Sequence, residues 1–149
     1  MKIEKIMPPT WMLIAMISML LLNFTFPLVW IVPPLWNLFG LVFLVSGMAL
    51  NLIADRAFHQ IGTTVKPYQE STSLVTEGVF QISRNPMYLG MVLILIGIGV
   101  LLKSLSPFLV ITLFAILIDR IYIRVEERML AEKFGTKWQA YKAQTRRWL

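Results

Sequence analysis

Two polar motifs in this chain combine residue types that could bind a ligand. The first is "SRNPMYLG" at residues 83–90, and the second is "RVEER" at residues 124–128. Carboxylates such as those of Glu126 and Glu127 accept hydrogen bonds from hydroxyl and amine groups, and an arginine fork donates to an anion. Tyr88 adds aromatic surface and a hydroxyl. Together these side chains could form a binding site.

Each motif also has a purely structural interpretation. Asn85 is a favourable N-cap, and Pro86 suits the first position of a helix. Ion pairs four residues apart on a solvated helix would account for "RVEER". Neither motif establishes a binding site alone, so the elements that position them must be considered next.

The composition indicates a membrane protein. Of 149 residues, 57% are hydrophobic and only 15% are charged. Uncharged stretches predict helices over residues 11–32, 35–54, 86–102 and 105–123. A crossing helix needs about 20 apolar residues, with a lower limit near 17. The first two stretches are long enough, the third is marginal, and the fourth has 15 uncharged residues, 104–118.

The expected fold is an all-α integral membrane protein, formed by residues 1–149 as a single domain. No stretch alternates at period two, and a bilayer interior admits only helices or closed barrels. About four transmembrane helices are predicted, the last two either crossing fully or forming a short hairpin that dips in and returns. A cytoplasmic loop at 55–85 and a cytoplasmic amphipathic helix within 124–149 complete the domain.

Basic residues predict the orientation. Lys2 and Lys5 precede the first helix, and eight of the fourteen basic residues lie from Arg120 onward. The two links on the other side carry only Lys103. By the positive-inside rule, both chain ends and the 55–85 loop face the cytoplasm. The net charge of +6 is therefore assigned to contact with anionic lipid headgroups along the tail, and nucleic acid is not expected as a partner.

The charged residues from 119 to 127 follow a helical spacing. At about 100° per residue, Arg120, Arg124 and Glu127 fall within about 60° of one another, while Asp119 shares a neighbouring face with Tyr122 and Glu126. The two adjacent glutamates thus point in different directions. Gly135 is expected to end this helix, and residues 136–147 begin a second amphipathic stretch.

The two motifs and their order resemble a known family. "LVTEGVFQISRNPMYLG", an apolar hairpin and "RVEERMLAEKFGTKWQAYKAQTRRWL" are similar to the isoprenylcysteine carboxyl methyltransferases, their prokaryotic relatives and the related phospholipid methyltransferases. The family pattern is a Gly-aromatic segment, Arg-His-Pro-x-Tyr-x-Gly, a helical hairpin, Glu-Glu, Phe-Gly and a Tyr- and Arg-rich tail. The resemblance covers residues 62–149 and extends to the first two helices only in general character.

The resemblance implies an enzyme that binds S-adenosyl-L-methionine on the cytoplasmic side and admits a lipidic or apolar methyl acceptor from the bilayer. The implied cofactor-binding positions are Gly78, Asn85, Pro86, Met87, Tyr88, Gly90, Glu126 and, as a weaker candidate, Glu127. Arg124, and after it Arg120, would face the acceptor. Asn85 stands where many members have histidine; it can donate and accept hydrogen bonds but cannot titrate, which puts any role of a charged imidazole in doubt.

Methyl transfer fits these residue types without a catalytic triad or a metal. A carboxylate acceptor is already ionised near neutral pH, since its unperturbed pKa is about 4. Aligning the reactants in a dry pocket can then lower the barrier by several kcal/mol, up to roughly 7–11. The acceptor stays open between an isoprenylcysteine-like carboxylate, a phospholipid amine and a small thiol, as does the oligomeric state.

Other features predict less. The sequence has no cysteine, and His59 is its only histidine, so no metal site is expected. Gly97 and Gly99 lie inside an apolar helix and indicate close helix packing rather than a dinucleotide-binding turn. The rival from another class is a non-catalytic membrane assembly or interaction protein. A transporter is disfavoured, because no ionisable residue lies in the middle of a predicted helix.

Overall fold

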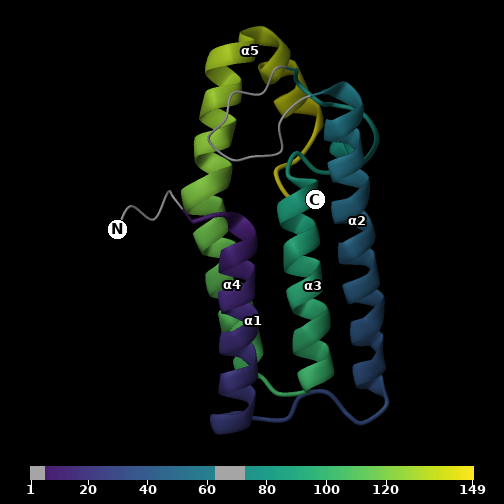
Figure 1. Cartoon of the computed structure of the whole chain (residues 1–149), viewed down its shortest axis with the longest axis vertical. Coiled ribbons are helices and arrows are strands. Elements are labelled where there is room, and N and C mark those ends of the chain that lie inside the picture. Colours follow the sequence, from purple (N-terminus) through teal and green to yellow (C-terminus); the bar gives the residue numbers. More distant parts are fainter. Residues whose placement is uncertain (1–5, 63–72) are drawn as a thin grey trace.

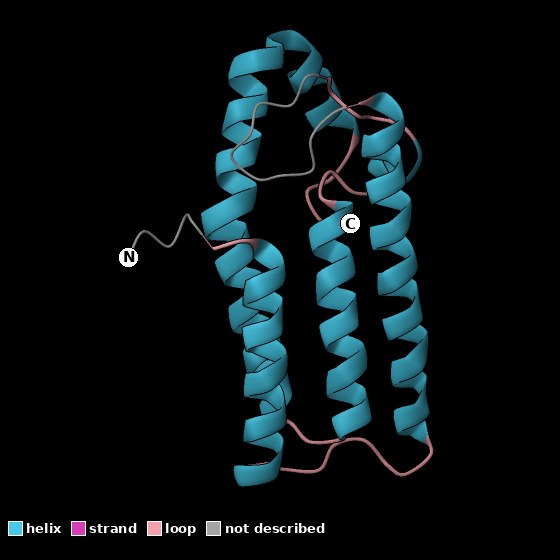
Figure 2. Cartoon of the chain, in the orientation of Figure 1, coloured by secondary structure: helices cyan, strands magenta, loops and turns pink. Residues whose placement is uncertain are grey.

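The computed structural model describes residues 6–62 and 73–149, so Lys2, Lys5 and Lys66, with their bearing on orientation, lie outside it. Within these residues every regular element is helical, and only an isolated bridge joins Trp30 to Ser104 (Figure 2). The elements are α1 (Pro8–Thr25), η2 (Trp36–Phe39), α2 (Gly40–Ile61), η3 (Gly78–Gln81), α3 (Pro86–Leu102), α4 (Ser106–Ile118), the π-helix η4 (Asp119–Ile123) and α5 (Arg124–Gln144). The prediction of an all-α fold is confirmed.

Two helical segments are long and apolar enough to cross a membrane. They are Pro8–Thr25, with a mean hydropathy of 1.4, and Trp36–Ile61, with 1.9. In the 18-residue apolar window of each segment, only 22% and 17% of the residues are buried in the protein, so most apolar side chains there face outward. Such surfaces are stable against lipid rather than water. The chain is an integral membrane protein.

The ends of the first two helices differ from the predicted ranges. The apolar stretch 11–32 is interrupted because Pro27 disfavours helical geometry at Phe26, whose φ of −149° and ψ of 71° end α1 at Thr25. The second helix continues past residue 54 through the charged residues to Ile61. Gly62 caps it with a φ of 66°, a left-handed conformation that glycine adopts at little cost.

The bundle has two helix pairs, α1 with α4 and α2 with α3 (Figure 1). Glycines allow α2 and α3 to approach closely. A Cβ built on Gly47 would lie 2.5 Å from the carbonyl oxygen of Gly90, and one on Gly97 would lie 2.6 Å from that of Gly40. The packing role predicted for Gly97 is therefore confirmed, and small residues serve it as they do in membrane helices generally.

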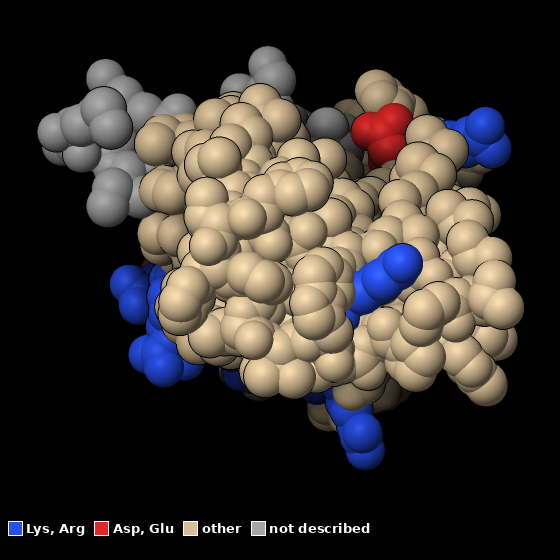
Figure 3. Space-filling model, turned by 90° about the horizontal axis from the view of Figure 1, so that it is seen from below, with Lys and Arg blue, Asp and Glu red and all other residues tan. Residues whose placement is uncertain are grey.

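The hairpin of α3 and α4 reaches the same end of the bundle as α1. Its turn is tied to the α1–α2 link by two backbone bonds of 2.9 Å, from the N–H of Ile31 to the oxygen of Lys103 and from the N–H of Leu105 to that of Val29. Buried Ser104 also donates to Asn23 Oδ1 at 2.7 Å. Figure 3 shows that this end is made mainly of uncharged side chains. The α3–α4 hairpin thus extends along the bundle to the same end as α1 and α2.

The helical path from α4 continues through η4 into α5, whose first half extends along the long axis of the molecule (Figure 1). It bends at Gly135, where φ is 50° and ψ is −117°. After the bend, Trp138 and Tyr141 pack with Phe80 in a second hydrophobic cluster. The expected helix end at Gly135 is confirmed.

Candidate functional site

The two motifs meet through a hydrogen bond between side chains 38 positions apart in sequence. The hydroxyl of Tyr88, in the first turn of α3, donates to Glu126 Oε1 at 2.6 Å. Tyr88 is buried, and its ring centroid lies 6.3 Å from that of Tyr122. Burial raises the pKa of Glu126 to about 7, although the Tyr88 hydroxyl acts in the opposite direction. Glu126 is therefore a carboxyl that changes charge near neutral pH.

The neighbouring Glu127 has a different environment. Arg84 donates from Nη2 to Oε1 at 2.8 Å, and Arg147 donates from Nη2 to Oε2 at 2.6 Å. We call Arg84, Glu127 and Arg147 the arginine clamp. Burial acts to raise the pKa of Glu127, but the hydrogen bonds and charges of Arg147 and Arg84 outweigh it and hold the pKa below its ordinary value.

The start of α3 is fixed by the segment that follows α5. Pro86 occupies the first helical position, as predicted, but the Asn85 side chain does not cap the helix. Its Nδ2 instead donates to the Arg147 carbonyl at 3.1 Å, and Ser83 Oγ donates to the same oxygen at 3.3 Å. Asn85 thus has the N-cap place without the expected N-cap bond, because the main chain of residue 147 is within its reach.

Asp119 lies on a different face from the predicted one. An uninterrupted α-helix would place it near Glu126. The π-helix η4 acts like an insertion of one residue, which rotates the following residues back by about 100° relative to Asp119. Asp119 is therefore aligned with Glu127, and Arg147 bridges them: Nη1 reaches Asp119 Oδ1 at 3.1 Å. The prediction that Asp119 and Glu126 share a face is wrong for this reason.

The arginines predicted to face an acceptor lie on the outside of this group. Arg124 donates from Nε to Asp119 Oδ2 at 3.1 Å, and its side chain is 48% exposed. This contact also follows from the π-helix, which brings residues five apart into the relation usual for residues four apart. Arg120 is exposed. Arg124 is thus paired with Asp119, and neither arginine takes part in the hydrogen bonds that join Tyr88 to Glu126 or Glu127 to Arg84 and Arg147.

The remaining predicted cofactor positions are dispersed. Gly78 is exposed at the start of η3, with a φ of 60°. Met87 packs against the hydrophobic cluster around Trp138. Gly90 faces α2, and a Cβ there would lie 2.6 Å from Asn51 Oδ1. Of the predicted set, the structure brings together Asn85, Tyr88, Glu126 and Glu127, whereas Gly90 serves helix packing.

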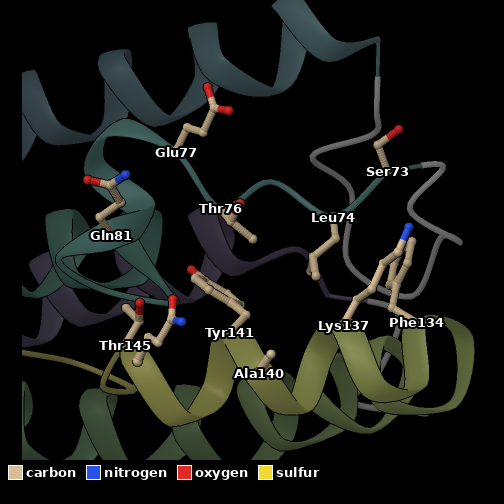
Figure 4. A pocket seen from close by; sticks show the side chains of 11 residues that line it. Ser73, Leu74, Thr76, Glu77, Gln81, Phe134, Lys137, Ala140, Tyr141 and Thr145 are labelled. Carbon is tan, nitrogen blue, oxygen red and sulfur yellow. The ribbon is translucent and has the colours of Figure 1, made fainter.

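A pocket of about 880 Å³ has Thr145, a hydrogen-bond partner of Arg84, among its lining residues. Figure 4 shows the side chains that line it. Its walls come from the segment before α3 and from the second half of α5, including Glu77, Gln81, Lys137, Tyr141 and Thr145. The volume lies within the roughly 300–1,000 Å³ typical of small-molecule sites. The Thr145 carbonyl also accepts a hydrogen bond from Arg84, so the pocket wall and the clamp are joined.

Sequence reasoning assigned no role to Arg84 or Arg147 and placed Asp119 on the wrong face. Arg84 lies within the quoted motif and Arg147 within the Arg-rich tail, but their shared partner Glu127 is 43 and 20 positions away. The sequence feature that could have indicated their role is that each arginine lies beside an end of a predicted helix. Among residues 6–62 and 73–149, no group of three or more His, Asp or Glu side chains could hold a metal ion.

Comparisons with known proteins show the family and the fold. The family model described as phospholipid methyltransferase matches residues 35–137. The solved structure of a eukaryotic intramembrane Ras methyltransferase, an isoprenylcysteine carboxyl methyltransferase, is similar with a TM-score of 0.66 and 22% identity. The match covers 95% of this chain but 51% of that protein, so this chain spans about half its length and shares its fold. No curated protein matches the sequence.

Proposed function

The chain belongs to the phospholipid methyltransferase family, and from this premise we propose that it transfers a methyl group from S-adenosyl-L-methionine to a membrane-borne or apolar acceptor. The reaction we propose is like that of an isoprenylcysteine carboxyl methyltransferase. The observation that carries the proposal is the 2.6 Å hydrogen bond between Tyr88 and Glu126, which joins the two motifs at the end of the bundle opposite the α1–α2 link.

Glu126 is the proposed anchor for the cofactor. When bound, the cofactor supplies an electrophilic methyl group on a cationic sulfonium, together with a ribose diol and an amine. Glu126 has a pKa of about 7 because burial disfavours its charge. A cationic ligand beside it would favour the ionised carboxylate, which accepts hydrogen bonds from hydroxyl and amine groups. Tyr88 orients this carboxylate by donating to Oε1.

The pocket is proposed to hold the polar part of such a ligand, because its wall residue Thr145 accepts a hydrogen bond from Arg84, which also binds Glu127, the neighbour of Glu126. Tyr141 and Phe134 contribute aromatic surface to the pocket, while Glu77 and Gln81 contribute hydrogen-bonding groups (Figure 4). Gly78 adjoins these residues in the chain and remains a proposed cofactor contact, as do Asn85, Pro86 and Met87 at the start of α3. Glu127 is proposed to act only through the arginine clamp, since both of its oxygens are occupied by arginines.

Arg124 is the proposed contact for an anionic acceptor, and Arg120 is second to it. Arg124 directly follows the apolar part of the α4–η4 path, and about half of its side chain is exposed. A guanidinium fork can orient a carboxylate, whose oxygen already carries the charge needed to attack a methyl group. Water exclusion by the surrounding lipid and apolar side chains would favour this transfer.

The proposed location is the cytoplasmic membrane of a prokaryote, with the site on the cytoplasmic side. Of the described basic residues, Arg56, Arg84 and all eight from Arg120 onward lie in or beside the segments at the Glu126 end, whereas Lys103 lies in the opposite turn. The positive-inside rule assigns the end rich in Lys and Arg to the cytoplasm.

Methyl transfer from labelled cofactor tests the proposal. The purified protein would be given a synthetic prenylcysteine, extracted phospholipids or a small apolar thiol as acceptor. We expect labelling of the prenylcysteine and its loss in the Tyr88→Phe, Glu126→Gln double variant. Labelling of the lipid amine would support a methyltransferase whose acceptor is a phospholipid and not a prenylcysteine. No transfer to any acceptor, or full activity of the folded double variant, would contradict the proposal.

A further inference from the structure

We infer that Arg147 is a positioning residue for Glu126: by bridging Asp119 and Glu127 across η4, it holds the helical register in which Glu126 faces Tyr88. This inference rests on the proposed role of Glu126 in cofactor binding. The hydrogen bonds of the Arg147 guanidinium go to Asp119 and Glu127, the neighbour of Glu126. Arg147 thus acts on the turn of helix that carries Glu126.

The bridge joins the first residue of the π-helix to the first turn of α5. Arg147 Nη1 donates to Asp119 Oδ1 at 3.1 Å, while Nη2 and Nε donate to Glu127 Oε2 and Oε1 at 2.6 and 3.3 Å. Asp119 is the first residue of η4, and Glu127 lies in the first turn of α5. One planar guanidinium therefore fixes how far α5 is rotated relative to α4, which a single-point ammonium could not do equally well.

The register matters because π-helical turns are local insertions in an α-helix. Return of η4 to α-helical geometry would rotate the start of α5 by about 100° about its axis relative to α4. Glu127 would then turn away from Asp119 and Arg147, and Glu126 would lose its alignment with Tyr88. Tyr88 lies on α3 and would not follow that rotation. The bridge thus selects the arrangement in which both motifs meet.

Arg147 is itself held in place by the start of α3. Its carbonyl accepts from Asn85 Nδ2 and from Ser83 Oγ. The N–H of Arg84 donates to the Arg146 carbonyl at 3.0 Å. On the other side of Arg147, Trp148 packs against the hydrophobic core around Tyr88 and Tyr122. Through these contacts, the bridge fixes the rotation of α5 relative to α3, the helix that carries Tyr88.

Calorimetric titration with S-adenosyl-L-methionine tests this role. We expect Arg147→Gln to weaken binding about tenfold, less than the roughly 100-fold that a 1 Å misplacement of a reacting group can cost. The binding stoichiometry should stay unchanged. Arg147→Lys should bind more tightly than Arg147→Gln but less tightly than the wild type. The matched control is Arg146→Gln, which removes the same charge from an exposed neighbour and should bind as the wild type does.

Affinity and stoichiometry, compared for the same variant, distinguish a positioning role of Arg147 from a role in fold stability alone. A variant that only unfolds more readily would show fewer sites with the wild-type Kd. That result, or an unchanged Kd and stoichiometry in Arg147→Gln, would overturn the inference. If Arg147→Gln cannot be obtained folded, Arg147→Lys provides the same comparison with a smaller expected loss.

A distance measurement keeps the inference independent of the proposed function. The chain has no cysteine, so spin labels can be placed at Gln60→Cys on α2 and Glu132→Cys on α5, both exposed. Arg147→Gln should shift or broaden the distance between the labels, and Arg146→Gln should not. If the wild type binds no S-adenosyl-L-methionine, the proposed function fails, and an unchanged label distance would separately overturn the role of Arg147.

Discussion

Glu126 and Glu127 are adjacent in the chain but lie in opposite electrostatic environments. Both side chains are removed from water to a large extent. The pKa of Glu126 is raised to about 7 by burial, and only the Tyr88 hydroxyl lowers it. The pKa of Glu127 is held below its ordinary value by Arg147 and Arg84. One carboxylate is compensated within the protein, and the other would gain most from a cationic ligand.

The difference arises from helix geometry. Adjacent residues on a helix point about 100° apart, so one turn can face two partners. The π-helix then determines which partners these are, because it aligns Glu127 with Asp119 and leaves Glu126 towards α3. A pair of identical side chains can therefore divide structural and binding roles between them. Substitutions at each glutamate should separate the two roles.

The largest expected effect is the loss of stability in Glu127→Gln. Removal of this charge leaves Arg84, whose side chain is only 7% exposed, without its carboxylate partner and leaves Arg147 paired with Asp119 alone. The unfolding free energy should therefore fall by about 3 kcal/mol. Thermal unfolding in detergent at pH 8 measures this change. Glu126→Gln is the matched control, and it should leave stability unchanged or higher, because no ionised carboxyl then remains buried. Equal losses in both variants would remove the distinction between the two sites.

The pH dependence of stability should sharpen the same contrast. The folded protein binds the Glu126 proton more tightly than the unfolded chain does, since its pKa rises from 4.5 to about 7. Its contribution is therefore fully present below about pH 4.5 and is lost as pH rises through 7. Unfolding of Glu126→Gln between pH 5 and 8 should lack this component. An identical slope in wild type and variant would contradict the assigned environment.

For Glu127 the sign is reversed. Its lowered pKa means that its stabilising contribution is present above the ordinary value of 4.5 and is lost as pH falls through the folded-state pKa. The stability difference between the wild type and Glu127→Gln should therefore shrink in acid. Unfolding scans from pH 6 downward would measure it, and a difference that stays constant or grows in acid would be inconsistent with the arginine clamp.

A smaller effect is expected for Tyr88→Phe. It removes a hydrogen bond worth about 1 kcal/mol, which corresponds to about a fivefold loss of affinity for S-adenosyl-L-methionine. Without that donor, the pKa of Glu126 should rise further, so the pH at which binding reaches half of its maximum should move upward. Titration calorimetry from pH 6 to 9 measures both. A variant with unchanged affinity and pH midpoint would show that Tyr88 does not orient Glu126.

The smallest effect on stability is expected for Arg124→Gln. Its pair with Asp119 is half-exposed, and such pairs contribute about 0–1 kcal/mol. The KM for a carboxylate acceptor should nevertheless increase, while the affinity for the cofactor stays the same. Steady-state rates with a prenylcysteine acceptor measure this, with Arg128→Gln as an exposed control on the same helix. A change in cofactor affinity with an unchanged KM for the acceptor would contradict the proposal that Arg124 contacts the acceptor.

Much of the fold could be predicted because long uncharged stretches in a bilayer must be helical. The predicted third helix, 86–102, has the bounds of α3, where Pro86 begins the helix and Lys103 leaves it with a φ of 68°. The end of α1 was missed because apolar residues continue beyond Pro27, and hydropathy does not register backbone geometry. The depth of the hairpin was open, since it depends on contacts between the turn and a distant link.

The site was only partly predictable. The resemblance paired Tyr88 with Glu126, and these two side chains are in contact. Arg147 and Asp119 were not found, because a helical projection assumes a constant rotation per residue and a π-helix breaks that assumption. Gly90 packs on α2, one of the two close approaches that a glycine there permits, and its assignment to the cofactor site stays a prediction.

The most direct test of the central claim is titration of the wild type, Glu126→Gln and Glu127→Gln with S-adenosyl-L-methionine at pH 8, alongside their unfolding temperatures. We predict saturable wild-type binding and an affinity at least about tenfold weaker in Glu126→Gln, as for loss of a charged hydrogen-bond acceptor, with no loss of stability. Glu127→Gln should be the less stable variant. Wild-type affinity in folded Glu126→Gln would contradict the claim that this carboxyl holds the cofactor.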